Sequence, residues 1–520
     1  MGTPSGHDVE FHLYSWLEVL SQWKHGILYP RWAALAHFGY GEPRFLFYPP
    51  ASWNLGALLS AILPWRFAGS VYVWIALVAA GASMFVLARR WLDRRDALFA
   101  ALLYTVNPYH LVIVYWRSAF AELLASCLVP LLLLLVLKAA EQGWRALAPL
   151  AILLAAAWLV NAPAAVMIHY SLALLIFVLA WQRRSLRIVW VGAAAVAVGA
   201  GLAAFYLFPA IYEQKWVNIA EAVSAGSRPQ DNFLFIHTTD ADHDAFNRII
   251  SWVAILEMAL LFVSAVASKL RRQINGELWN TLSVWAMGCV VLMFSASALL
   301  WRALPKLGFM QFPWRWMLCL SLIFSLFVTT GAKRWWMRAG IGLVVLLVMA
   351  AEWHFVQAPW WDNAADLHEM QDNMRDGVGY EGTDEYTPVG ADPSAMNLTA
   401  IEKDVFKVRV QGSAHADIHV VLWDAESKLF TAEMSAPDQL ALKLFRYPAW
   451  KTEVNGRVVE TGARAETGQM LVPVEAGMNR VQIKFIRTWD RRAGGWISVV
   501  FVVCTAFGIV LAGRQPVSSQ

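Results

Sequence analysis

Long apolar runs alternate with short polar connections through most of the chain. A membrane-spanning helix needs about 20 mostly apolar residues, and runs of this kind predict eleven crossings. These are 70–90, 97–116, 121–138, 146–161, 164–182, 187–209, 249–270, 278–300, 313–331, 338–357 and 496–513. Because only Asn161-Ala162-Pro163 separates the fourth run from the fifth, these two predict a tight helical hairpin.

The pattern changes to a two-residue alternation near residue 404, in stretches such as "FKVRVQG", "DIHVVLWD" and "NRVQIKFI". Alternating apolar and polar residues are typical of strands with one buried face. Asn455-Gly456 and Ala476-Gly477 supply turns between such strands. The segment therefore predicts a small antiparallel β-sandwich.

Composition agrees with a polytopic membrane protein. Of the 520 residues, 58% are hydrophobic and 15% are charged, against about 25% charged in soluble domains. The formal charge is only +4, and the basic residues fall between apolar runs, which argues against nucleic acid as a partner. The four cysteines lie inside apolar runs and imply no disulfide framework.

The short basic clusters predict the orientation, because basic connections favour the cytoplasm. They lie at 89–95, 138–145, 183–187, 269–272 and 333–338. The predicted divisions are then an outer first loop 1–69, a membrane domain 70–357, an outer linker 358–403, an outer β-domain 404–495, and a final helix with a cytoplasmic tail 496–520.

Two stretches of the first loop predict helices that lie at the outer membrane surface. One is "FHLYSWLEVLSQWKHGI", in which apolar residues recur at helical spacing. The other runs from Pro49 to Trp65 and has only about 15 residues between prolines, which is short for a crossing.

Candidate chemistry gathers on the predicted outer face. Asp8, Glu10 and His12 stand at the head of the chain, and Arg117 and Glu122 flank an outer turn in "YWRSAFAE". Arg315 lies in "QFPWRW". A carboxylate in such a loop is often merely solvated, and a Trp-flanked arginine can be an interface anchor. However, an arginine at the outer end of a membrane helix is costly unless it is paired or functional, and its guanidinium suits phosphate.

A second outer loop carries the acidic stretch "HTTDADHDAF". His237, Asp240, Asp242 and His243 could hold a divalent cation if their side chains converged, which a sequence cannot establish. A solvated turn is the simpler interpretation. "NPYH" at Asn107 and "NAP" at Asn161 predict helix breaks.

Three function classes remain. One is an enzyme with an outer carboxylate as base and arginines that hold a lipid-linked phosphate. Another is a transporter or flippase for a lipid-linked glycan or polyprenyl lipid, which would be expected to carry charges near the membrane centre. The third is a non-catalytic cell-envelope assembly protein. Charges gathered at one face favour the enzyme.

The motifs "GHDVEFH", "FYPP", "LARRWLDRR", "NPYHLVIVYWRSAFAE", "QFPWRW" and "YPAWKTEVNG" resemble the GT-C superfamily of membrane glycosyltransferases. Within it they look most like the bacterial YfhO-like proteins and the membrane family labelled 6-pyruvoyl-tetrahydropterin synthase-related. The resemblance extends over nearly the whole chain. It implies a GT-C-like helical fold whose first membrane helix precedes the outer-loop aspartate, so we expect that helix to be missing from this chain.

The resemblance also implies a function. Asp8 matches the catalytic base and Glu10 its acidic companion, while His12, Arg44, Tyr48, Arg117, Glu122 and Arg315 match substrate-binding positions. The implied donor is a polyprenyl-phosphate sugar, and the implied acceptor is a glycan, lipid or protein. The expected location is a bacterial cytoplasmic membrane with an extracytoplasmic active face, and a divalent cation is a possible cofactor.

Overall fold

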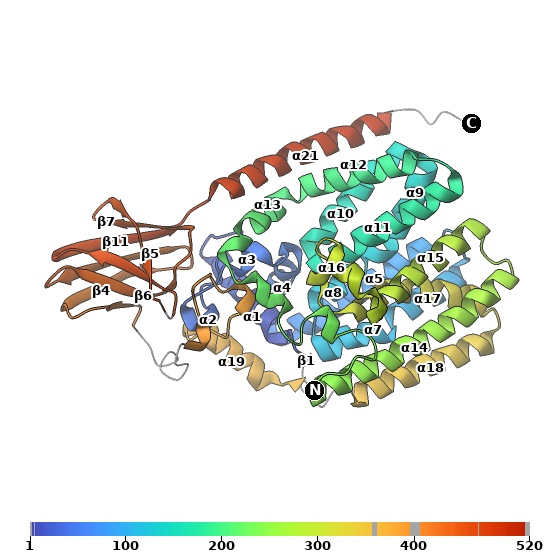
Figure 1. Ribbon diagram of the computed structural model, residues 1–520, viewed down its shortest axis with the longest axis horizontal. Coiled ribbons are helices and arrows are strands. Elements are labelled where there is room, and N and C mark those ends of the chain that lie inside the picture. Colours follow the sequence, from blue (N-terminus) through green and yellow to red (C-terminus); the bar gives the residue numbers. More distant parts are fainter. Residues whose placement is uncertain (1–2, 5, 356–360, 396–405, 466, 515–520) are drawn as a thin grey trace.

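The chain folds into a helical bundle with a β-sandwich at one end (Figure 1). The computed structural model describes residues 3–4, 6–355, 361–395, 406–465 and 467–514. The predicted start of the β-domain at residue 404 lies outside these ranges. After the sandwich, the last helix runs back along the bundle.

The bundle consists of apolar helices, several of them bent or interrupted. They are α5 (Trp65–Ala88), α6 (Arg94–Thr105), α7 (Pro108–Leu111), the π-helix η1 (Val112–Arg117), α8 (Phe120–Ala125), α9 (Leu128–Gln142), α10 (Leu147–Val160), α11 (Ala162–Arg183), α12 (Arg187–Leu202), α13 (Ala204–Glu213), α14 (Ala241–Leu270), α15 (Gly276–Met293), α16 (Ala298–Ala303), α17 (Met317–Gly331), α18 (Trp335–Phe355) and α21 (Trp489–Arg514). The chain is thus a membrane protein with several candidate spans.

Six helices in the described part of the chain are long and apolar enough to cross a membrane, or nine if each of three bent pairs forms one span. The prediction of eleven differs in two places. The prediction assigned two crossings to residues 120–160, which count as one candidate span here, although Gly143 with a positive φ separates α9 from α10. It also assigned a crossing to α18, whose apolar stretch is shorter than a span requires. The number eleven is therefore not confirmed.

Both predicted helix breaks are present and have the same cause. Asn107 caps α7 by accepting a hydrogen bond of 2.9 Å from the His110 backbone N–H. Asn161 caps α11 in the same way through Ala164, also at 2.9 Å. In each case a proline follows in the first turn, where its missing N–H costs nothing. The predicted hairpin of α10 and α11 is confirmed.

Short helices cover the end of the bundle that faces the sandwich. They are α1 (Val9–Lys24), α2 (Ala36–Gly39), α3 (Arg44–Phe47), α4 (Pro50–Ile62) and α19 (Ala364–Arg375). As predicted, α4 is separate from α5, and the chain turns at Pro64. The sequence interpretation missed α19, which begins with a capping box of Asn363 and Asp366 inside the predicted linker.

The predicted antiparallel sandwich is confirmed. Its strands are β3 (Val408–Val410), β4 (Ala416–Trp423), β5 (Ser427–Met434), β6 (Asp438–Phe445), β7 (Trp450–Val454), β8 (Arg457–Val459), β9 (Gly462–Ala463), β10 (Gln469–Val474) and β11 (Gly477–Phe485). One sheet has the order β3-β6-β10-β9 and the other β4-β5-β11-β7-β8. Leu442 and Val472 of the first sheet and Phe430 and Val481 of the second are buried in one core.

The sandwich is joined to the N-terminal region by a shared aromatic core. The Trp32 side chain is fully buried, and its ring lies 5.7 Å from Tyr447, 5.4 Å from Trp450 and 5.6 Å from Phe485, measured between ring centroids. Trp32 comes from the loop between α1 and α2, whereas its partners belong to the sandwich. Trp32 of the N-terminal region therefore forms part of the hydrophobic core of the sandwich.

We expect Trp32→Ala to loosen this junction, because truncating a buried aromatic residue costs about 3–5 kcal/mol. The variant should release the sandwich faster under limited proteolysis and lower the thermal unfolding midpoint. Trp144→Ala is the matched control, since Trp144 is 53% exposed. Equal protease resistance of the two variants would contradict the shared core.

Candidate functional site

Asp8 is placed by backbone pairing between the head of the chain and the end of the π-helix η1. The Asp8 N–H donates to the Arg117 carbonyl at 2.8 Å, and the His7 N–H donates to the Trp116 carbonyl at 3.2 Å. Gly6 allows this approach, since a Cβ there would lie only 2.6 Å from the Trp116 carbonyl oxygen. Asp8 is thus fixed beside Arg117.

Four charged side chains meet at this point. The Arg117 Nη2 lies 3.4 Å from an Asp8 carboxylate oxygen, and its Nη1 donates to Glu122 at 2.7 Å. Arg315 lies 3.1 Å from the same Glu122 oxygen, measured from Nε. The Tyr109 hydroxyl donates to the other Glu122 oxygen. The structure therefore brings together Asp8, Arg117, Glu122 and Arg315, which come from three separate motifs.

The four groups differ sharply in exposure. The Glu122 side chain is 1% exposed, Arg315 5% and Arg117 8%, whereas Asp8 is 27% exposed. Buried charges are tolerated only when they are paired, and the two arginines balance the two carboxylates. Asp8 is the accessible end of this network and also its most loosely paired member.

Aromatic rings support both guanidinium groups. The Arg117 guanidinium lies 5.0 Å from the Phe312 ring centroid and 5.6 Å from that of Trp314, and Arg315 lies 4.7 Å from Phe312. Such cation–π contacts favour arginine over lysine. The "QFPWRW" motif thus supplies the Arg315 guanidinium and also the aromatic rings that pack against Arg117 and Arg315.

The Asp8 carboxyl group has a lowered pKa. Burial raises this pKa, but the hydrogen bond from His7 and the charge of Arg117 together outweigh burial. The His7 Nδ1 lies 2.8 Å from the second Asp8 oxygen, and the His7 side chain is 87% exposed. Asp8 is therefore ionised at neutral pH and can accept a proton or a cation.

His12 and Tyr48 flank the charged network. Burial lowers the pKa of His12 to about 4, so this side chain is neutral. Its ring stacks on Phe120 at 5.2 Å and meets the edge of Tyr48 at 5.9 Å. Burial raises the pKa of Tyr48 well above its usual range, and the charges of Asp8 and Arg117 both act on its hydroxyl. The charge of Asp8 thus acts on both side chains.

Arg44 belongs to a second buried cluster. Its Nε lies 2.5 Å from Glu42, its Nη1 donates to Ser15 at 3.1 Å, and His37 lies 2.9 Å from the other Glu42 oxygen. Burial raises the pKa of Glu42, but Arg44 and His37 reduce it to about 2. Arg44 therefore has a structural partner, which sequence reasoning missed.

The predicted linker folds back over this second cluster. The Thr383 N–H donates to Glu42 at 2.9 Å, and the Tyr380 hydroxyl donates to Glu18 on α1. Burial raises the pKa of Glu385 to about 7, and its charge acts on His7. The stretch "GVGYEGTDEY" is polar and lies in the predicted linker, and its sequence alone did not predict these contacts.

Glu10 lies on another face of α1. Its side chain reaches solvent, but partial desolvation and the charges of Asp362 and Glu381 raise its pKa. Asp8 and Glu10 thus do not share one set of partners, and the role of Glu10 as acidic companion stays a prediction.

The acidic loop has structural roles. Asp240 caps α14 by accepting from the His243 N–H at 2.8 Å, and His243 Nε2 lies 2.9 Å from Asn232. His237 lies 3.1 Å from Asp244, while Asp242 is exposed. Among the residues that the structure describes, no three His, Cys, Asp or Glu side chains are grouped so as to hold a metal ion.

Glu122→Gln should destabilise the protein by about 3–5 kcal/mol, because it leaves two buried arginines short of a counter-charge. Glu141→Gln is the matched control, since Glu141 pairs with Arg90 but is 44% exposed, and such pairs contribute about 0–1 kcal/mol. Thermal unfolding in one detergent compares the two variants. Equal midpoints would show that Glu122 is not the counter-charge on which the network depends.

A comparison with solved structures finds archaeal oligosaccharyltransferases with a distant overall likeness to this chain. AglB from Archaeoglobus fulgidus, in complex with an inhibitory peptide and a dolichol-phosphate, is 12% identical with a TM-score of 0.38, over 73% of this chain and 53% of that chain. The apo form of the Archaeoglobus fulgidus enzyme gives 12% and 0.37 over 73% and 53%. The chain thus spans about half the length of these enzymes. No curated protein matches it.

A protein-family comparison gives a clearer result. The family model described as "6-pyruvoyl-tetrahydropterin synthase related domain; membrane protein" matches residues 45–359, which is more than half of the chain. The matched range includes Arg117, Glu122 and Arg315. The chain therefore belongs to the 6-pyruvoyl-tetrahydropterin synthase related family of membrane proteins.

Proposed function

We propose that this protein is a membrane glycosyltransferase that moves a sugar from a polyprenyl-phosphate donor to an acceptor hydroxyl, with Asp8 as the general base. The observation that carries the proposal is an accessible carboxylate held against a buried arginine pair at the end of a membrane bundle. The resemblance of its motifs to GT-C glycosyltransferases supports the same function.

The arginines suit the phosphate of the donor. A guanidinium presents a planar fork that matches phosphate oxygens, and Arg117 is already rigid because Glu122 and two aromatic rings hold it. Its contact with Asp8 is 3.4 Å, against 2.7 Å with Glu122. A phosphate would therefore replace the weaker partner, Asp8, and leave the Glu122 pair intact.

This exchange would also activate the base. When Arg117 turns to the phosphate, Asp8 loses the positive charge that lowers its pKa, and its carboxylate becomes more basic. Donor binding would thus prepare Asp8 for the acceptor.

The reaction then needs one proton transfer. Asp8 takes the proton of the acceptor hydroxyl, the acceptor oxygen forms a bond to the anomeric carbon, and the bond from that carbon to the phosphate oxygen breaks. Polyprenyl phosphate leaves with the bonding electrons, and Arg117 and Arg315 stabilise its added charge. Attack from the face opposite the phosphate inverts the anomeric carbon.

One observation favours a transporter as the second candidate. Glu257 on α14 is 4% exposed, and among the described residues neither of its carboxylate oxygens has a hydrogen-bond partner. A carboxylate inside a membrane helix is typical of proton or substrate pathways. Loss of function on Glu257→Gln, with none on Asp8→Asn, would favour this candidate.

Asp8→Asn should reduce sugar transfer by about 10²–10⁴-fold, because it keeps the shape of the side chain and removes its basicity. Purified protein with a panel of radiolabelled polyprenyl-phosphate sugars measures the rate. Asp417→Asn, on an exposed edge of the sandwich, is the control that should keep the parent rate. Transfer by Asp8→Asn at the parent rate would rule out the base assignment.

The pH dependence provides a separate check. The pKa of Asp8 is lowered in the free protein, so Asp8 stays ionised at pH values where an ordinary carboxyl group is already protonated. We therefore expect kcat/KM to fall only at a pH below the usual range of a carboxyl group. His7→Ala removes the hydrogen bond to Asp8, so the acid limb should move to higher pH with little change of the plateau. The control His368→Ala, at an exposed residue on α19, should leave the limb in place. An unmoved limb in His7→Ala would mean that another group controls it.

A further inference from the structure

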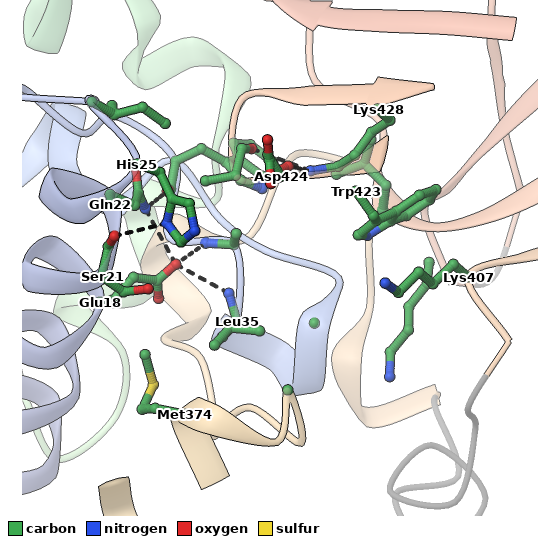
Figure 2. A pocket seen from close by; sticks show the side chains of 18 of the residues that line it. Glu18, Ser21, Gln22, His25, Leu35, Met374, Lys407, Trp423, Asp424 and Lys428 are labelled. Atoms are coloured by element: carbon green, nitrogen blue, oxygen red, sulfur yellow. Dashed lines mark hydrogen bonds between the residues drawn. The ribbon is translucent and has the colours of Figure 1, made fainter. Parts of the chain in front are cut away.

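Two pockets of the protein differ in the charges of their linings. The pocket between α1 and the β-sandwich, shown in Figure 2, has a volume of about 450 Å³ and is lined by three carboxylates and three lysines. Its charges balance, so they select no charged ligand. The second pocket, of about 260 Å³, is lined by two arginines and, among the described residues, by no carboxylate.

The second pocket has an apolar floor. One wall comes from the loop segment 223–233, and the other comes from α16 and the short helix η7 (Leu307–Met310). The Phe233 and Trp301 side chains are 2% and 4% exposed, and their rings meet edge to face with 6.0 Å between the centroids. The interior of the pocket therefore suits a hydrocarbon group.

The two arginines bring positive charge to this pocket. The Arg228 Nε lies 3.0 Å from Asp231, whereas its two Nη groups have no partner among the described residues. Arg302 at the end of α16 is exposed and makes no hydrogen bond or ion pair with any described residue. Lys306 lies beside η7, and the carboxylates Glu221 and Asp231 of the same loop are outside the lining. The pocket thus keeps an excess of positive charge.

The pocket lies at the membrane surface. The segment Ser295–Ala303, which includes α16, is bent by 91° from α15, and because α15 belongs to the membrane bundle, this bend directs α16 along the surface. Leu299 and Leu300 on α16 are 75% and 43% exposed. Phe235 and Trp252 on the adjoining loop and α14 are 41% and 62% exposed, and exposed aromatic residues are typical of the membrane–water interface.

An amphiphile with a phosphate group fits both parts of the pocket. A guanidinium presents a planar fork that matches phosphate oxygens, and the apolar floor accepts hydrocarbon. The volume is below the range of about 300–1,000 Å³ that encloses a whole small ligand, so the pocket holds only part of a larger molecule. An inorganic anion would use only the arginines, and a neutral apolar molecule only the floor.

We propose that this pocket binds an anionic phospholipid of the bilayer, whose phosphate pairs with Arg228 and Arg302 and whose acyl chain packs on Phe233 and Trp301. The site is distinct from the buried arginine pair of the candidate site. The inference does not depend on the glycosyltransferase function proposed above.

The glutamine Gln311 connects the pocket to the candidate site. Its Nε2 donates to the Ala222 carbonyl at 2.6 Å, and its Oε1 accepts from Arg315 at 3.3 Å. Its φ of 64° is unfavourable for a residue with a side chain. The neighbouring residues Val223 and Phe309 line the pocket. A lipid bound there would contact both segments that Gln311 joins, and so it should restrict the motion of the segment that carries Arg315.

Native mass spectrometry of the full chain in detergent measures the affinity for the first bound lipid. The probes are phosphatidylglycerol, which is anionic, and phosphatidylcholine with the same acyl chains, which has no net charge. The parent should bind phosphatidylglycerol about tenfold more tightly. Arg228→Gln together with Arg302→Gln should remove this preference, because it loses charge-assisted contacts. Both residues are exposed, so the variant should keep its fold.

Lys215→Gln together with Arg248→Gln is the matched control, since both residues are exposed and lie outside the lining. It should keep the preference of the parent. Ala298→Phe fills the floor and retains both arginines, so it should weaken the binding of phosphatidylglycerol. An unchanged preference in the double arginine variant, an equal loss in the control, or full binding by Ala298→Phe would overturn the proposal.

Amide hydrogen exchange in nanodiscs locates the bound lipid. Phosphatidylglycerol should protect residues 223–233 and 298–316 more than phosphatidylcholine does in the parent, and this difference should disappear in the double arginine variant. Protection that is confined to the segments around Asp8 and Arg117, or displacement of phosphatidylglycerol by an equimolar polyprenyl phosphate, would assign the lipid to the candidate site and overturn the inference.

Discussion

Glu122 lies between Arg117 and Arg315, and the arrangement of the candidate site depends on this buried carboxylate. Two guanidinium groups withdrawn from water repel one another unless a negative charge separates them. Glu122 supplies that charge from α8, while the arginines end the π-helix η1 and precede α17. Three segments of the bundle are thereby held in one geometry, and Asp8 is held through its backbone hydrogen bond to Arg117 at the end of η1.

The same constraint explains why Asp8 is chemically distinct from its neighbours. Glu122 is saturated by two arginines and a tyrosine, so it is structural. Asp8 has one long contact with Arg117, an exposed histidine, and the largest exposure of the four charges. An incoming anion or hydroxyl would therefore meet Asp8 first and could displace it without dismantling the network.

Much of the fold could be predicted from the sequence because its signals are local. Apolar runs indicated the helices, the two-residue alternation indicated the sandwich, and Asn-Pro motifs indicated the breaks at Asn107 and Asn161. By contrast, α19 has few apolar residues and buries mainly Leu367 and Met370, so its pattern was too weak.

The site was only partly predictable. Arg117 and Arg315 stood out because they oppose the usual distribution of basic residues. Asp8 stood out by its place in the predicted first outer loop, and its role as the base came from the resemblance. Nothing local could show that Glu122 bridges two arginines that lie 198 positions apart in the sequence, or that Glu42 holds Arg44 beneath Thr383. These pairings depend on how distant segments pack, which the residues around each member do not encode.

The most direct measurement is a cryo-electron microscopy structure of the full chain with a polyprenyl phosphate bound. We expect phosphate density against Arg117 and Arg315, an unbroken pair between Arg117 and Glu122, and an Asp8 carboxylate that has moved away from the 3.4 Å contact it now makes with Arg117. Phosphate density elsewhere, with the contact between Asp8 and Arg117 unchanged, would contradict it.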